Sequence, residues 1–93
     1  MESAVEALLE LTTENEREAV KLAYTNGSTS TREITKALNL EGIRSFTLVC
    51  SLVRKGIFYL RLEENGQNSY AHYEIKSPYK EIVSWGIRNK KFE

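Results

Sequence analysis

The 93-residue sequence contains no aspartate and only one cysteine and one histidine. Without aspartate, an aspartate-dependent catalytic triad and an aspartate-based metal site are excluded. Cys50 has no second cysteine for an internal disulfide or a cysteine-based zinc site, and His72 has no neighbouring second ligand. Because a Gly-rich phosphate-binding loop is also missing, we expect no enzyme activity, no cofactor and no metal.

Long apolar runs are also absent, since none approaches the about 20 residues that a membrane span needs. The acidic start, Met1–Ser3, lacks the basic and apolar regions of a signal peptide. With 41% hydrophobic and 28% charged residues, the composition is that of a soluble globular protein. We therefore expect one intracellular domain over residues 1–93, with no membrane partner.

The charges are distributed unevenly, although the net charge is zero. Residues 1–20 hold six glutamates and one arginine, whereas residues 21–62 hold seven lysines and arginines and two glutamates. Local charge, rather than net charge, attracts phosphates. The basic central segment therefore favours a nucleic-acid partner, although small soluble domains also show uneven charge by chance.

Helix-start signals and the spacing of apolar residues divide the chain into a series of elements. Capping boxes are predicted at Ser3 with Glu6, Thr13 with Glu16, and Ser30 with Glu33. The predicted elements are an N-terminal helix over 1–12, a second helix over 13–27, two short helices over 28–56, a hairpin over 57–76 and a C-terminal helix over 77–93. The fourth helix is expected to cover Arg44 to Lys55. This order predicts a mostly helical α+β protein.

The hairpin is indicated by apolar residues that alternate with polar ones on both sides of an Asn-Gly pair. A two-residue turn at 65–66 would pair Leu60 with Ala71. A four-residue loop over 65–68 would pair Leu60 with Tyr73 and Leu62 with Ala71. Either even loop places the apolar side chains of both strands on one face of the hairpin.

Two short helices joined by a tight turn and followed directly by a hairpin describe a winged helix-turn-helix. Residues 31–40 look like its first helix, and residues 45–60 look like its recognition helix and first wing strand. The pattern Leu48-Val49-x-x-Leu52-x-x-Lys55-Gly56-Ile57 resembles that of the MarR-like winged-helix DNA-binding proteins. The chain is also similar to small winged-helix proteins encoded by viruses of hyperthermophilic archaea. The resemblance implies a transcription regulator that binds specific double-stranded DNA sequences, in the host cytoplasm if the chain is virus-encoded.

Helix-turn-helix geometry selects the candidate DNA contacts, because the start of the second helix lies nearest the bases. Arg44, Ser45 and Thr47 are the predicted base-edge contacts. The other predicted DNA-binding residues are Ser30, Thr31, Arg32, Lys36, Ser51, Arg54, Lys55 and Arg61. The alternative is that these polar side chains form an ordinary solvated face.

Two features near this surface have more than one interpretation. Phe46 is expected to be partly exposed, either touching a thymine methyl group or, as we favour, packing against the wing or the preceding loop. The wing tip carries Glu63 and Glu64, which phosphates would repel. Insertion of the wing into the minor groove is therefore not expected.

A homodimer is predicted, because so short a chain has a modest core and its last helix is apolar on more than one stripe. The predicted interface residues are Val5, Leu8, Leu11, Ile82, Trp85 and Gly86. The alternative is a monomer whose terminal helices close over one core. Cys50 is expected to be partly exposed, as a reduced thiol or, in a hyperthermophile, as an intersubunit disulfide.

A protein–protein interaction module is the alternative function, with the acidic residues 1–20 and the acidic wing as contact surfaces. The two functions differ in what they require of Lys36, Arg44 and Arg54. A solvent-exposed basic face favours DNA, whereas burial against a partner chain favours a protein contact.

Overall fold

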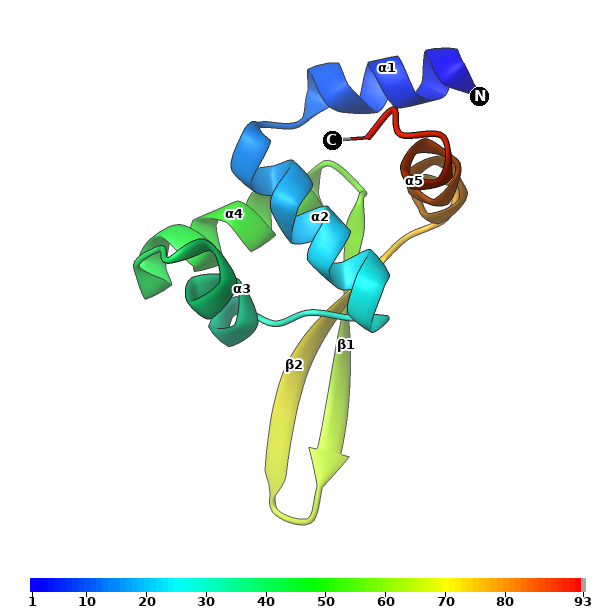
Figure 1. Ribbon diagram of the computed structural model, residues 1–93. Coiled ribbons are helices and arrows are strands. Elements are labelled where there is room, and N and C mark those ends of the chain that lie inside the picture. The colour runs from blue at the N-terminus through cyan, green and yellow to red at the C-terminus, as the bar shows by residue number, and fades with distance from the viewer. Residues whose placement is uncertain (93) are drawn as a thin grey trace.

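The computed structural model describes residues 1–92, which form five helices and one antiparallel hairpin (Figure 1). The elements are α1 (Glu2–Leu11), α2 (Glu14–Asn26), α3 (Thr31–Leu38), α4 (Gly42–Arg54), β1 (Phe58–Asn65), β2 (Asn68–Ile75) and α5 (Tyr79–Arg88). The architecture is α+β and mostly helical, a winged-helix-like fold in which the hairpin is the wing. This confirms the predicted fold class.

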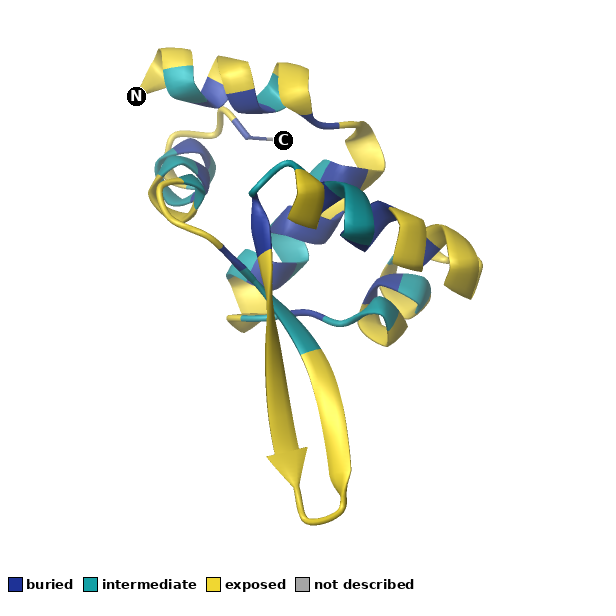
Figure 2. Ribbon diagram, turned by 180° about the vertical axis from the view of Figure 1, so that it is seen from behind, coloured by how far each residue is buried: buried dark blue, intermediate teal, exposed yellow. Residues whose placement is uncertain are grey.

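The core lies where α2, α3 and α4 meet the base of the wing. Its side chains come from the inward face of each helix and from the first residues of the hairpin, as in Val20, Ile34, Leu52 and Phe58. Figure 2 shows buried residues gathered in the helical body and an exposed wing that projects from it. The helix pair α3–α4 is therefore held on a packed support.

The starts of the first three helices test the predicted capping boxes. Thr13 and Glu16 form the complete box at α2. At α3, Ser30 accepts a hydrogen bond from the Glu33 amide, but the Glu33 carboxylate accepts from Thr29 instead of returning to the cap. The box at Ser3 is wrong, because α1 already begins at Glu2, and the Val5 amide donates to the Met1 carbonyl.

Helix α4 begins two residues earlier than predicted, at Gly42 rather than Arg44. The reversal from α3 is made at Asn39, which has a left-handed backbone with φ 55°. Asparagine tolerates that conformation better than most residues do. Gly42 is therefore free to enter the helix, and Arg44 lies within the first turn of α4.

The wing adopts the pairing predicted for the longer loop, with Leu60 opposite Tyr73 and Leu62 opposite Ala71. Pairing continues to Asn65 opposite Asn68, so the connection is the two-residue turn of Gly66 and Gln67. Gly66 has φ 66°, which suits glycine at this position of a hairpin turn. The wing projects beyond the body, so its apolar face at Leu60 and Leu62 is exposed.

The C-terminal segment departs from the predicted helix over 77–93. Helix α5 ends at Arg88, and Lys90 has a left-handed backbone. The amides of Lys91 and Phe92 then donate to the Gly86 carbonyl at 2.7 and 3.1 Å. Phe92 returns to the core and is only 2% exposed. In the described residues, no helix is long and apolar enough to cross a membrane.

Candidate nucleic-acid interface

Four basic side chains on the helix-turn-helix unit are exposed. Arg32 and Lys36 lie one turn apart on α3, and Arg44 and Arg54 lie near the two ends of α4. Within residues 1–92, none of the four forms an ion pair. Their charges are therefore not balanced by a carboxylate in contact, and they can attract an anionic partner.

The structure removes Ser45 from the predicted base contacts. Ser45 is fully buried, and its hydroxyl accepts a 2.8 Å hydrogen bond from the Thr35 hydroxyl. A side chain inside the α3–α4 contact cannot reach a base edge. Thr47 is exposed, but its hydroxyl donates to the Ile43 carbonyl at 2.9 Å. Arg44 is the predicted base-edge residue whose polar atoms stay free of other described residues.

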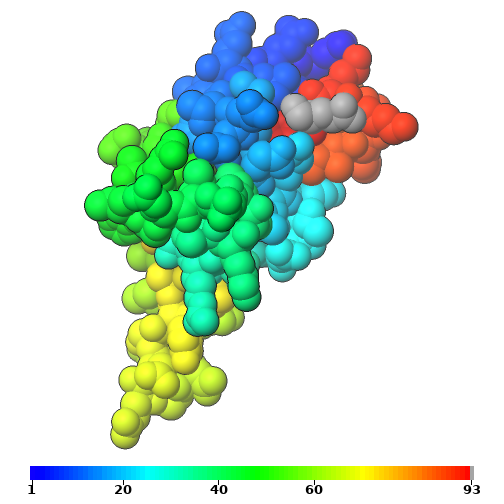
Figure 3. Space-filling view, turned by 60° about the vertical axis from the view of Figure 1, so that its left-hand side comes forward, coloured from blue at the N-terminus to red at the C-terminus, as the bar shows by residue number. Residues whose placement is uncertain are grey.

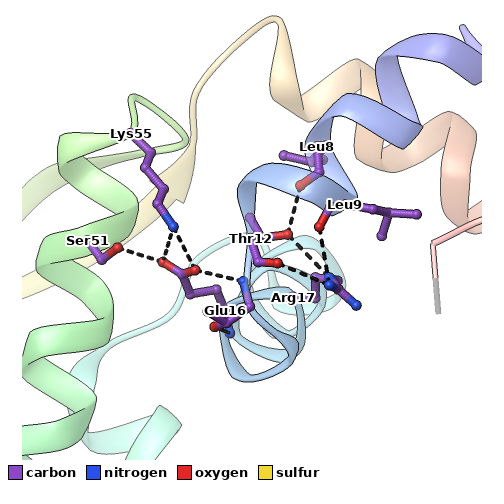
Figure 4. Close-up of polar contacts among 8 residues, drawn as sticks. Leu8, Leu9, Thr12, Glu16, Arg17, Ser51 and Lys55 are labelled. Atoms are coloured by element: carbon purple, nitrogen blue, oxygen red, sulfur yellow. Dashed lines mark hydrogen bonds and ion pairs between the residues drawn. The ribbon is translucent and has the colours of Figure 1, made fainter.

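Ser51 and Lys55 were predicted as DNA contacts, but both bind the carboxylate of Glu16, as Figure 4 shows. The Ser51 hydroxyl donates at 2.7 Å, and the Lys55 ammonium lies 2.8 and 2.9 Å from the two carboxylate oxygens. The Thr13 amide donates a further bond at 2.8 Å. We call Glu16, Ser51 and Lys55 the Glu16 cluster. The cluster joins the start of α2 to the end of α4. The charge of Lys55 is balanced by the Glu16 carboxylate of the same chain.

The Glu16 cluster shifts the pKa of its carboxyl group. Burial by itself raises the pKa of Glu16, but hydrogen bonds from Lys55, Ser51 and the Thr13 amide, together with the charge of Lys55, outweigh it. The net result is a pKa below the ordinary value of 4.5. The cluster therefore favours the ionised carboxylate in the folded protein.

Because the folded-state pKa is lowered, the stabilisation from Glu16 is present above pH 4.5 and is lost as the pH falls through the folded value. We expect Glu16→Gln to lower the free energy of unfolding by about 2 kcal/mol at pH 7, the scale of hydrogen bonds to a charged group. The deficit should shrink below pH 4.5. Urea unfolding across pH tests this, with exposed Glu18→Gln as the control. A pH-independent deficit would contradict it.

The wing does not present Arg61 to a phosphate. The Arg61 guanidinium lies 2.9 Å from Glu74 and 3.1 Å from Glu63, so two carboxylates balance its charge. His72 lies 3.2 Å from Glu63 on the same face. In the described residues, no group of three potential ligands could hold a metal ion. The prediction of Arg61 as a DNA contact therefore lacks support from this geometry.

The remaining predicted contacts lie at the start of α3 and on α4. Ser30 and Thr31 are half-buried, and the Ser30 hydroxyl already accepts a hydrogen bond from the Glu33 amide. Cys50 is half-buried, which confirms its predicted partial exposure. Phe46 is 57% exposed, which confirms its predicted partial exposure and leaves more than half of the residue uncovered by the wing or the preceding loop. Ile43, which is not among the predicted contacts, is 72% exposed.

The predicted dimer interface divides into two parts. Val5, Leu8 and Gly86 are buried within their own chain, so they are not available to a partner. A Cβ atom at Gly86 would lie 3.0 Å from the Cβ of Phe92 and 3.4 Å from Val5, so the close approach that glycine permits is intramolecular. Leu11 is exposed, and Ile82 and Trp85 are half-buried.

A groove of about 250 Å³ lies between α1 and α5. It is lined by Ala4, Ala7, Leu8, Leu11, Pro78, Tyr79 and Ile82. We call it the α1–α5 groove. None of the described residues in this lining is charged, so the groove leaves an apolar surface open to solvent.

The space-filling view in Figure 3 shows the wing extending away from the helical body, with α3 and α4 on the face toward the viewer. The features of this surface that bear on function are its exposed basic side chains, Arg32, Lys36, Arg44 and Arg54.

Comparison with models of known protein families and with curated proteins finds no match for this chain.

Proposed function

We propose that this protein binds specific double-stranded DNA sequences as a homodimeric transcription regulator. The observation that carries the proposal is the set of exposed, unpaired basic side chains on α3 and α4: Arg32, Lys36, Arg44 and Arg54. They lie on the two helices that a helix-turn-helix protein applies to the duplex. Lys55 and Arg61, by contrast, are engaged by carboxylates of the chain.

Each basic residue has a distinct proposed role. Arg44, in the first turn of α4, reaches a base edge, where a guanidinium can bind guanine with two hydrogen bonds. Arg32, Lys36 and Arg54 hold phosphates on either side of the groove. The Glu16 cluster fixes the end of α4 against α2, which sets the angle at which the recognition helix is presented.

A homodimer would place two copies of α4 in successive major grooves, about 34 Å apart. The α1–α5 groove is the proposed contact surface, with Leu11 and Ile82 in its lining, while the buried Val5, Leu8 and Gly86 belong to the core of their own chain. This arrangement uses a surface that the single chain leaves uncovered. It also leaves α3 and α4 free for DNA.

Salt-dependent binding tests the DNA contact. A duplex selected from a random pool is titrated at two salt concentrations and followed by fluorescence anisotropy. Lys36→Ala and Arg54→Ala should each weaken binding to all sequences and reduce the salt slope by about 1, because one phosphate contact is lost. Arg44→Ala should cost about 1–3 kcal/mol on the selected site and relax the preference at one base position.

Lys80→Ala is the matched control, because Lys80 is exposed but lies on α5, away from the helix-turn-helix unit. It should leave affinity and salt slope unchanged. The proposal fails if the wild type binds no duplex even at low salt, or if Lys36, Arg44 and Arg54 can all be replaced without loss.

The exposed apolar face of the wing favours a second candidate function, a protein–protein interaction module. Leu62 is 63% exposed, and Leu60 precedes it on the same face. Glu64, which lies next to the tip and pairs with no cation of the described residues, would suit a basic partner better than DNA. Failure of all duplex binding in the titration above would favour this candidate.

A further inference from the structure

The first half of α4 presents apolar side chains to solvent where a helix-turn-helix protein meets the bases. Ile43 and Phe46 are one turn apart, and both are largely exposed. Single exposed apolar residues are common on protein surfaces. Here two large apolar residues, Ile43 and Phe46, lie on the same turn of helix as the exposed Arg44. A ligand with both apolar and polar groups would suit this surface.

The polar alternatives in this half of the helix are occupied. Ser45 is buried against Thr35, and the Thr47 hydroxyl is bonded to the Ile43 carbonyl. Arg44 therefore provides the free hydrogen-bond donors here, and Ile43 and Phe46 provide contact area. In the major groove, the C5-methyl of thymine is the apolar group that a base edge displays.

We propose that Ile43 and Phe46 read thymine methyl groups next to the base contacted by Arg44, so that the preferred site contains thymines at fixed positions in each half-site. This inference rests on the proposed DNA-binding function. The surrounding charges support DNA as the occupant over an apolar protein partner. Arg44 lies on the same turn as these side chains, and Arg32, Lys36 and Arg54 lie elsewhere on α3 and α4. None of the four pairs with a carboxylate of the described residues, and a phosphate backbone complements them.

The experiment replaces thymine with uracil in the selected duplex, one position at a time. The substitution removes the methyl group and preserves base pairing. At each thymine that is read, the wild type should bind the uracil duplex about fourfold more weakly, the factor expected for one buried methyl group. Substitution at positions outside the half-sites should have no effect.

Ile43→Ala and Phe46→Ala should each bind thymine and uracil duplexes equally at the position that the lost side chain reads. Both side chains are exposed, so the fold should be retained, which circular dichroism verifies. Val53→Ala is the control, since Val53 is an exposed apolar residue near the other end of α4. It should keep the wild-type preference for thymine.

The outcomes separate the two proposals. A wild type that binds the selected duplex with equal affinity for thymine and uracil at every position overturns the inference and leaves DNA binding intact. Discrimination that survives in both alanine variants overturns the assignment to Ile43 and Phe46. A wild type that binds no duplex overturns the proposed function and this inference together.

Discussion

A variant carrying both Ala7→Glu and Leu11→Glu is expected to be a folded monomer that binds a two-half-site duplex about 100-fold more weakly than the wild type. Both residues line the α1–α5 groove and are exposed, so the change places charge in the proposed interface without entering the core. The loss of affinity follows because a monomer forfeits the effective concentration that links two recognition helices, an advantage of about 10²–10⁴. Light scattering and anisotropy titration measure the two effects.

Two controls make this result specific. Leu62→Glu places the same charge on another exposed apolar surface, on the wing, and should leave the oligomeric state unchanged. A duplex with a single half-site can engage only one recognition helix at a time, so it should bind the double variant and the wild type with equal affinity. A wild type with the mass of one chain at micromolar concentration, or a double variant that remains dimeric, would contradict the proposed interface.

Phe92→Ala is expected to lower the free energy of unfolding by about 3–5 kcal/mol, the range for truncating a buried phenylalanine. Phe92 is nearly fully buried, its amide is bonded to the Gly86 carbonyl, and its Cβ lies close to Gly86. The ring therefore closes the end of α5 over the body. Urea unfolding monitored by circular dichroism gives the value.

Phe46→Ala provides the comparison, because it removes the same side chain from an exposed position. Surface substitutions of this kind usually change stability by less than about 0.5 kcal/mol. Equal losses for the two variants would show that Phe92 is not part of the core in solution.

The order of elements was predictable from the sequence because each signal is local. Apolar spacing marks the helices, and strict alternation marks the wing strands. Alternation alone fixed which face each strand residue occupies but left the loop length open, because both even loops preserve the faces. In the observed turn, Gly66 occupies the first central position with a positive φ, which the sequence could not distinguish from the alternative.

The candidate site was less predictable, because contacts between residues far apart in the sequence decide which polar side chains stay free. Lys55 is bound by Glu16 across 39 residues, and Ser45 is buried where α3 crosses α4. Neither contact has a signature in local spacing. Among the predicted contacts, Arg32, Lys36, Arg44 and Arg54 pair with no carboxylate of the described residues. They do carry a local signal, namely basic residues on the outward sides of short amphipathic helices.

The position of Phe92 was not predicted, for a different reason. One apolar residue after a run of polar and basic ones has no periodicity, so the sequence predicted a helix continuing to the chain end. The reversal at Lys90 and the bonds to the Gly86 carbonyl depend on the space beside a glycine. A helical wheel does not represent that space.

The length of the exposed wing can change independently of the stability of the helical body. Every residue from Tyr59 to Ala71 is exposed, so this part of the hairpin contributes little to the buried core. Insertion or deletion of one paired residue on each strand changes its length by about 3.4 Å and leaves the base of the hairpin unaltered. Wing length and tip charge can therefore change with little effect on the packing of the helical body, so the reach of the wing and the stability of the fold are set by different residues.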